Sequence, residues 1–233
     1  MIGIIGAMES EVRGLVHDME QEHSEVISGI TFYIGMLKNS PVVVAQCGVG
    51  KVAAAVVAQT MILKYNVQSV INTGVAGALS KDLRICDLVI SSETVEHDMD
   101  TSPIGDPVGL ISGMNIIRMQ ADPGISADLT RIAKDQGDHV LHGLVATGDQ
   151  FIASSAQKEK ILGNFPDALC AEMEGSAIAH VCTQNQVPFC ILRSISDNAD
   201  GDADMDFPTF AAKAAEVSIH LLEKYLEEKG SKA

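Results

Sequence analysis

The chain has 233 residues, of which 46% are hydrophobic and 20% charged, enough for one domain over residues 1–233 with a hydrophobic core. Its formal net charge of −15 disfavours nucleic acids and anionic membranes as partners, because phosphate groups attract basic surfaces. No apolar run of about 18 residues is present, and the N-terminus "MIGIIGAMESEV" turns acidic early, so we expect a cytoplasmic protein without a membrane partner.

Segments rich in β-branched residues predict strands, in chain order, at residues 2–5, 30–37, 41–46, 69–73, 87–95, 144–147, 168–173 and 189–195. Helical patterns lie between them at residues 51–65, 126–136, 155–162 and 175–186, and a last helix begins at residue 210 with Gly230 just past its end. This alternation predicts an α/β fold. The segment "LKNSPV" indicates a hairpin, so the sheet should be mixed. The irregular stretch 96–115 is long and should serve a function or an interface.

Two glycine-rich segments follow predicted strands. "CGVGKVAA" contains Gly48 and Gly50 in a form of the dinucleotide-binding pattern, but the next strand ends in Asn72 and Thr73 instead of the acid that holds a ribose, so we do not expect NAD. A Walker loop is excluded because Lys51 is followed by valine. We interpret this segment as a tight turn with exposed N–H groups, and "NTGVAGAL", residues 72–79, as a second glycine turn that lets the backbone come close to another group at a strand end. Two such turns and the Glu172–Glu174 pair suggest a shared crevice.

Metal sites and disulfides are not expected. His97 with Asp98 and Asp100, and His139 with His142, lack a third well-spaced ligand. The aspartates after residue 197 do not match the spacing of a calcium-binding loop. The five cysteines are odd in number and form no CxxC pair, which favours reduced thiols.

Four carboxylates are candidates for a site. Glu172 and Glu174 lie where a predicted strand gives way to a helix, and ligands of open α/β sheets bind at such carboxyl ends. Asp197 ends the apolar run "PFCILRSIS" and is a candidate proton donor. Glu11 lies at the start of a predicted helix after the first strand, where the helix dipole favours an acid. From its spacing alone, Glu11 is interpreted as an ordinary acidic residue of a helix N-terminus.

Six segments in this order carry a family resemblance: "IGIIGAMESEV", "GVGKVAAA", "NTGVAGAL", "TGDQFI", "AEMEGSAIAHVC" and "LRSISDNAD". Over nearly the whole chain they closely resemble the bacterial 5'-methylthioadenosine/S-adenosylhomocysteine nucleosidases. The resemblance implies a nucleoside phosphorylase-like fold, which is a mixed central β-sheet surrounded by α-helices in a single domain. It also implies a homodimer that needs no cofactor and hydrolyses a small-molecule adenine nucleoside.

The resemblance further implies the roles of the polar residues. Glu11 would activate the attacking water and Asp197 would protonate or hydrogen-bond N7 of the leaving adenine. Glu174 would bind the ribose hydroxyls, while Glu172 and Arg193 would help to order the water. These roles suit the chemistry, because cleavage of an N-glycosidic bond builds positive charge on the ribose and negative charge on the purine.

Other positions would shape the pocket. Phe151 would stack on the adenine, the Ile152 backbone would read its edge, and Ser196 would orient the acid, while Met173 would lie against the sugar. The remaining lining positions implied by the resemblance are Ala7, Met8 and Val49, with Phe207 over the alkylthio group and Thr101 and Ile104 contributed by the partner subunit.

Three alternatives stay open. A phosphorylase would use phosphate in place of water, although arginine is scarce and the segment "GAMESEV" offers acids where phosphate would need cations. The same motifs also serve an aminodeoxyfutalosine nucleosidase, and a protein that binds a nucleoside without turnover is the third alternative. The chain departs from the family at Val75, where a serine is usual, and in the loop 96–115, which lacks the usual aromatic residues.

Overall fold

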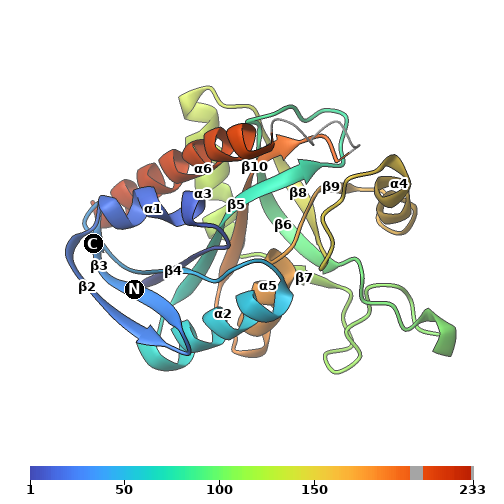
Figure 1. Cartoon of the computed structure of the whole chain (residues 1–233), viewed down its shortest axis with the longest axis horizontal. Helices are drawn as coiled ribbons and strands as arrows, with labels where there is room; N and C mark the ends of the chain where they lie inside the picture. The colour runs from blue at the N-terminus through green and yellow to red at the C-terminus, as the bar shows by residue number, and fades with distance from the viewer. Residues whose placement is uncertain (200–206, 232–233) are drawn as a thin grey trace.

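The computed structural model describes residues 1–199 and 207–231, with the backbone alone for residues 207 and 208. Within these residues the chain forms a ten-stranded sheet and six α-helices (Figure 1). The strands are β1 (Ile2–Gly6), β2 (Glu20–Ile27), β3 (Ile30–Leu37), β4 (Ser40–Gln46), β5 (Ser69–Ala78), β6 (Leu88–Glu96), β7 (Arg118–Gln120), β8 (Val140–Thr147), β9 (Ala168–Glu172) and β10 (Phe189–Asp197). The helices are α1 (Glu9–His17), α2 (Lys51–Tyr65), α3 (Pro123–Gln136), α4 (Ser155–Asn164), α5 (Gly175–Gln184) and α6 (Phe207–Gly230), with a short 3-10 helix η1 (Ser102–Ile104).

The sheet is mixed and partly closed. Its strand order is β10-β6-β8-β9-β5-β1-β4-β3-β2, with β7 paired to β6. Because β10 also pairs with β5, the strands β5, β10, β6, β8 and β9 form a closed ring, from which β1, β4, β3 and β2 extend. Parallel pairs such as β1–β5 and β5–β10 occur beside antiparallel pairs such as β3–β4 and β6–β10. The prediction of a mixed α/β fold is therefore confirmed.

Helices cover both faces of the sheet (Figure 1). On one face α1, α3 and α6 bury Leu15, Leu129 and Leu222 in a common apolar core. On the other face α2 and α5 bury Val57 and Ile178 in a second core. Successive strand residues point to opposite faces, so the apolar runs of β1 and β10 supply both cores at once.

The predicted hairpin at "LKNSPV" is confirmed. Strands β3 and β4 pair antiparallel, and the two residues between them, Lys38 and Asn39, have φ angles of 49° and 62°. Two successive positive φ angles are what a two-residue hairpin turn requires to match the twist of its strands.

The second glycine segment is not a turn, contrary to the prediction. Strand β5 continues past Thr73 to Ala78, and neither Gly74 nor Gly77 has a positive φ. A side chain at Gly74 would approach Glu11 Oε1 to 2.6 Å, and one at Gly77 would approach Asp197 Oδ1 to 2.8 Å. These glycines therefore provide space for neighbouring side chains and do not reverse the chain.

Smaller differences have local causes. Strand β2 was not predicted because most of its residues are exposed and polar, and β7 has only three residues. Helix α5 ends at Gln184 instead of residue 186, because Gln186 adopts a positive φ of 56°. Strand β9 ends one residue before Met173, and α6 begins earlier than expected, at Phe207, and includes Gly230.

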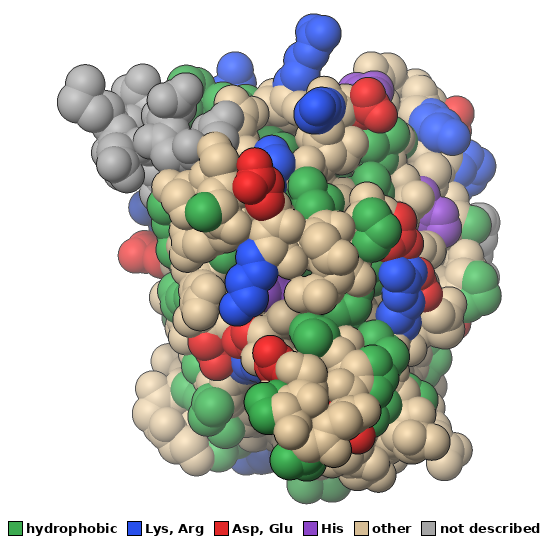
Figure 2. All heavy atoms as spheres, turned by 90° about the vertical axis from the view of Figure 1, so that its right-hand side faces the viewer, with side chains coloured by type: hydrophobic (Ala, Val, Ile, Leu, Met, Phe, Trp, Pro, Cys, Tyr) green, Lys and Arg blue, Asp and Glu red, His purple; other side chains and the backbone are tan. Residues whose placement is uncertain are grey.

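The segment between β6 and β7 is irregular, as expected for residues 96–115, apart from η1 and a single bridge between Ile111 and Ile116. The face of the molecule shown in Figure 2 carries Lys and Arg side chains interspersed with Asp and Glu, so its charge is locally mixed despite the acidic total. Among the described residues no helix is both long and apolar enough to cross a lipid bilayer.

Candidate active site

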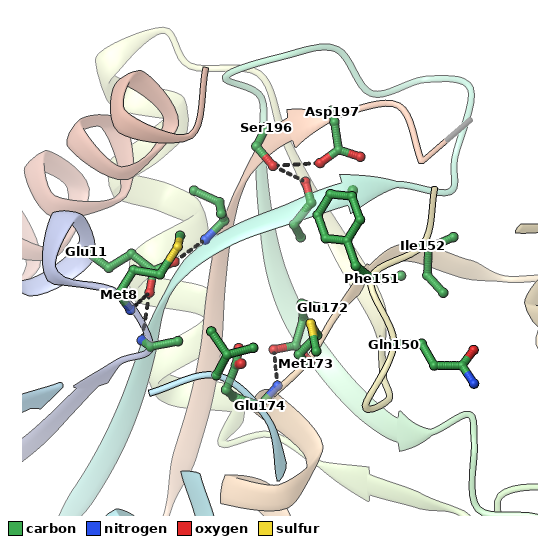
Figure 3. Close-up of a pocket in the computed structure, with 16 residues that line it drawn as sticks. Met8, Glu11, Gln150, Phe151, Ile152, Glu172, Met173, Glu174, Ser196 and Asp197 are labelled. Carbon is green, nitrogen blue, oxygen red and sulfur yellow. Dashed lines mark hydrogen bonds between the residues drawn. The ribbon is translucent and has the colours of Figure 1, made fainter. Parts of the chain in front are cut away.

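One cavity lies at the carboxyl ends of β5, β9 and β10, beside the start of α1 and α5 (Figure 3). This is the edge of an α/β sheet at which ligands commonly bind. The structure brings together around it these residues singled out in the sequence: Ala7, Met8, Glu11, Val49, Phe151, Ile152, Glu172, Met173, Glu174, Ser196 and Asp197.

Glu11 is a buried carboxylate held by backbone donors. Its Oε2 accepts hydrogen bonds from the N–H groups of Ala7 at 2.7 Å and Met8 at 2.9 Å, and its Oε1 accepts one from Val75 N–H at 3.0 Å. Only 2% of the residue is exposed. The carboxylate is therefore fixed at the cavity wall, with Gly74 leaving the space that it occupies.

Arg193 lies behind the cavity and is not one of its lining residues. It is fully buried and donates from Nη2 to Glu172 and to Asn72 Oδ1, while Glu174 Oε2 lies 3.4 Å away. Burial alone would lower the pKa of Arg193, but Glu172 and Glu174 outweigh that effect and raise it. Its Nε and Nη1 have no hydrogen-bond partner among the described residues, so Arg193 has donors to spare.

Glu172 is saturated with partners. Besides Arg193, its Oε2 accepts from the N–H groups of Glu174 at 3.1 Å and Gly175 at 2.7 Å, and its Oε1 accepts from the Thr147 hydroxyl. Two of these donors are N–H groups at the start of α5, where a helix dipole favours negative charge. Glu172 consequently fixes the backbone that carries Glu174.

Glu174 is held less tightly. Its Oε1 accepts from Gly50 N–H at 2.9 Å, at the start of α2. Burial, opposed by Arg193 and reinforced by Glu172 and Glu11, leaves the pKa of Glu174 raised to about 7. The N–H groups of the first glycine segment thus bind carboxylates of the chain itself, since Lys51 N–H also donates to Asp149 Oδ1 at 2.8 Å.

Asp197 stands at the end of β10 on another side of the cavity (Figure 3). The Ser196 hydroxyl donates to its Oδ2 at 2.8 Å, and Ala199 N–H donates to its Oδ1 at 2.9 Å. Asp197 is only 5% exposed. Two donors of this kind orient the carboxyl group toward the space that Gly77 leaves free.

Apolar side chains supply the rest of the wall. Phe151 lies after β8 with 47% of its surface exposed, and Ile152 beside it is buried. Met173, Met8 and Val49 line the cavity from other segments. A half-exposed aromatic ring beside a cavity offers a flat surface for stacking.

Among the described residues singled out in the sequence, Arg193, Thr101 and Ile104 do not line this cavity, and Arg193 lies behind it. Thr101 and Ile104 lie in the irregular segment after β6, where Thr101 donates to Asp106 Oδ2 at 2.8 Å and Ile104 is 82% exposed. Phe207 begins α6, but its side chain lies outside the described part of the chain. All five cysteines are free thiols, and among the described residues His, Cys, Asp and Glu form no group of three that would hold a metal ion.

Sequence reasoning missed several residues of the site. Gln150, Ala76, Gly77 and Ala171 line the cavity, and the buried Thr147 joins Glu172 to the start of α5 through Ser176 N–H at 2.8 Å. The glycines of "NTGVAGAL" were the available signal, because glycine in a strand often marks a close approach of another group.

The fold and the site define a class of protein. The family model described as "Phosphorylase superfamily" matches residues 1–227, so the chain belongs to that superfamily. Named relatives narrow the class further. The chain is 40% identical over 227 residues to the 5'-methylthioadenosine/S-adenosylhomocysteine nucleosidase of Shewanella pealeana, covering 97% of this chain and 99% of the relative.

Solved structures are similar over the same length. The nucleosidase of that name from Neisseria meningitidis, in complex with methylthio-immucillin-A, has a TM-score of 0.94 and 36% identity, covering 97% of this chain and 98% of the other. A futalosine hydrolase of Helicobacter pylori has a TM-score of 0.91 and 37% identity, covering 97% of each chain. The expected resemblance to N-glycosyl hydrolases of this superfamily is thus confirmed.

Proposed function

We propose that the protein hydrolyses the N-glycosidic bond of 5'-methylthioadenosine and S-adenosylhomocysteine, releasing adenine and 5-methylthioribose or S-ribosylhomocysteine. The observation that carries this proposal is the arrangement of Glu11, Glu174 and Asp197 around one cavity, on different sides of it (Figure 3). The names of the similar proteins support the substrate class.

At the sugar, Glu11 acts as the base that activates water. Glu174 accepts hydrogen bonds from the vicinal ribose hydroxyls, and its negative charge favours the cationic sugar that forms as the bond breaks. Met173 lies against the sugar, while Arg193, with Glu172 as its counter-ion, offers spare donors that order the water.

At the base, Asp197 donates a proton or a hydrogen bond to N7 of the departing adenine, which lowers the charge that accumulates on the purine. Ser196 orients this acid through the 2.8 Å hydrogen bond to its Oδ2. Phe151 stacks on the adenine, and the backbone of Ile152 reads its edge.

Water, and not phosphate, is the acceptor of the sugar. The three N–H groups that meet at Glu11 form a site suited to an anion, and the carboxylate of the chain already fills it. None of the described residues that line the cavity is Lys or Arg, and Arg193 is paired with two carboxylates behind it. Phosphate binding commonly relies on such cations.

Further parts of the proposal concern the 5' end and the assembly. Val49 lines the site, and Thr101 and Ile104 reach the cavity of the partner in a homodimer. Phe207, whose side chain lies outside the described residues, is assigned to the alkylthio group. The protein works in the cytoplasm without a cofactor. The similarity to a futalosine hydrolase makes aminodeoxyfutalosine the second candidate substrate.

The test is the release of adenine from 5'-methylthioadenosine by the purified protein, with and without phosphate. We expect release in the absence of phosphate. Release only with phosphate would identify a phosphorylase, and binding without release would identify a nucleoside-binding protein. Faster release from aminodeoxyfutalosine than from either thioether would favour the second substrate.

A further inference from the structure

Charged side chains meet outside the cavity, where α2 begins and where β6 and β8 end. The group, which we name the Lys51 cluster, consists of Lys51, Glu96, Asp98, Asp149 and His180. The Lys51, Glu96 and Asp98 side chains are at most one-fifth exposed. No role proposed above uses this cluster. Lys51 lies in the segment "CGVGKVAA", Glu96 and Asp98 lie in "EHDMD", and Asp149 and His180 come from "TGDQFI" and "AEMEGSAIAHVC".

Three members form a closed ring of hydrogen bonds. Lys51 Nζ donates to Asp98 Oδ1 at 2.7 Å, and Asp149 N–H donates to Asp98 Oδ2 at 2.9 Å. Lys51 N–H completes the ring by donating to Asp149 Oδ1 at 2.8 Å. Lys51 donates to both of the others, Asp98 accepts from both, and Asp149 donates to Asp98 and accepts from Lys51, so the three segments cannot shift independently.

The ring is braced on its buried side. Lys51 Nζ also contacts Glu96 Oε2 at 3.2 Å, and Glu96 Oε1 lies 3.1 Å from Nδ1 of His180 on α5. Burial lowers the pKa of Lys51, but Asp98 and Glu96 outweigh this and raise it, so the ammonium form is favoured. Burial likewise raises the pKa of Asp98, but Lys51 outweighs it and lowers that pKa.

The ring joins two ends of the cavity. Next to Lys51, Gly50 N–H donates to Glu174, the carboxylate proposed for the ribose. Next to Asp149 come Gln150, Phe151 and Ile152, which line the other end. The N–H groups at the start of α2 are occupied by Glu174 and Asp149, so this helix start is not free to bind a ligand anion.

We infer that Lys51 and Asp98 are positioning residues, which fix the distance between the ribose-binding Glu174 and the adenine-binding segment 150–152 through the ring with Asp149. This inference rests on the proposed function. Glu11 and Asp197 have other partners, namely Ala7, Met8 and Val75 for the former and Ser196 and Ala199 for the latter. Loosening the ring should therefore weaken binding of the whole nucleoside more than it slows the chemical step.

The test compares Lys51→Met with Lys64→Met. Both substitutions remove an ammonium group from α2 that pairs with a carboxylate, but Lys64 contacts Glu25 at the far end of the helix. For Lys51→Met we expect KM for 5'-methylthioadenosine to rise roughly tenfold with kcat changed less than about threefold, because the lost contacts are charge-assisted hydrogen bonds that position the binding groups. Lys64→Met should leave both constants unchanged.

Binding of adenine alone distinguishes a positioning role of Lys51 from a general loosening of the cavity. Adenine contacts only one end of the cavity, so its inhibition constant should change less than about twofold in Lys51→Met while nucleoside binding weakens. Asp98→Asn, which keeps the shape of the side chain, should show the same pattern more weakly. Equal losses for adenine and nucleoside, or a KM no higher than that of Lys64→Met, would refute the inference.

The proposed function is checked separately in the same experiment. Release of adenine by the unsubstituted protein tests that function. If the unsubstituted protein binds 5'-methylthioadenosine without cleaving it, titration of the nucleoside and of adenine into each variant still compares the two affinities, so the role of the ring is decided either way.

Discussion

Glu11 and Glu174 are both buried carboxylates of one cavity, but their surroundings differ. Glu11 accepts three backbone N–H groups, whereas Glu174 accepts one, from Gly50, and has Arg193 at 3.4 Å. Backbone donors are fixed in place, so Glu11 is oriented before substrate arrives, and Glu174 keeps acceptor capacity for a diol. The two residues are thus suited to different roles.

Replacing Glu11 tests the proposed base. In Glu11→Gln the amide oxygen can accept hydrogen bonds from the Ala7 and Met8 N–H groups. The amide NH2 then faces Val75 N–H, and since both groups are donors, that hydrogen bond is lost. We expect kcat to fall about 10²–10⁴-fold and the free energy of unfolding to fall by roughly 1–3 kcal/mol. Steady-state kinetics, thermal unfolding and titration with an unreactive adenosine analogue, whose binding should be retained, measure these effects.

An unchanged kcat in Glu11→Gln would shift the role of base to Glu9 or Glu172. The structure makes both weaker candidates. The side chain of Glu9 is 73% exposed beside Arg13, and Glu172 already has four donors.

Replacing Asp197 tests the proposed acid. Asn can still accept the hydrogen bond from Ser196 or Ala199, but it cannot donate a carboxylic proton. We expect Asp197→Asn to lose about 10²–10⁴-fold in kcat with little change in the unfolding temperature. Asp167→Asn, which removes a surface carboxylate paired with Arg118, is the matched control and should keep full activity. Near-normal turnover of Asp197→Asn would remove the acid from the mechanism.

At the scale of elements, β5 organises the site. It pairs with β1, β10 and β9 along its length, and its glycines leave room for Glu11 and Arg193 on one side and Asp197 on the other. A strand that touches both proposed catalytic groups has little freedom to accept larger side chains near its end.

Gly74→Ala should disrupt this arrangement. The added Cβ would stand 2.6 Å from Glu11 Oε1 and would also collide with Nη1 of Arg193, both of which are buried. We expect stability to fall by roughly 1–3 kcal/mol from overpacking, together with a loss of kcat. Gly163→Ala is the control, since a Cβ there meets nothing within 4 Å and Gly163 lies in α4, where alanine favours the helix. Equal unfolding temperatures and activities for both variants would contradict this account of β5.

The elements also show how far the sequence predicts the fold. Strands β3 and β10 are apparent in the sequence because they are rich in apolar, β-branched residues, and helix α2 because it is rich in alanine. The polar strand β2 is not, since it is stabilised by pairing with β3 and most of its residues are exposed. For the strand end at Gly74–Ala78 the sequence predicts both a turn and a close approach of the backbone, and only the close approach is present. Glycine permits both, and only the neighbouring side chains distinguish them.

At the scale of the whole molecule, residues far apart in the sequence meet around a few buried charges. Local pattern places Glu172, Glu174 and Asp197 at strand ends, and the family resemblance supplies their roles. Neither reveals that Arg193 bonds to Asn72 and Glu172, or that Lys51 closes a ring with Asp98 and Asp149. Such contacts depend on how strands and helices pack, which one sequence does not specify locally.

The acidic excess of the molecule extends into its cavity. Glu11, Glu172, Glu174 and Asp197 are each less than one-tenth exposed, while Arg193 is the buried cation beside them. For Glu174, burial and the neighbouring carboxylates make ionisation costly, which raises its pKa. The ionised form of Glu174, which is proposed to bind the ribose, is therefore the form that lowers the stability of the fold.

Glu174 should make that link measurable through pH. Its pKa of about 7 in the folded protein lies above the ordinary value of 4.5, so the folded state holds the proton more tightly than the unfolded state. The stability that this group contributes is complete below pH 4.5 and is lost as pH rises through about 7. Binding changes in the opposite sense, because the ionised form accepts two hydrogen bonds from the diol, so KM should fall as pH rises through 7.

Glu174→Gln removes the titration while keeping an acceptor for Gly50 N–H. As pH rises from 5 to 8, the free energy of unfolding of the variant should increase relative to that of the unsubstituted protein. The relative increase should be on the order of 2–3 kcal/mol for a pKa shift of this size. Its KM should be high and nearly independent of pH. Unfolding temperatures and KM values of both proteins across this range provide the measurement. If the two stability profiles run parallel, Glu174 does not titrate near pH 7, and the ionised carboxylate that binds the ribose is then present at no cost to the fold.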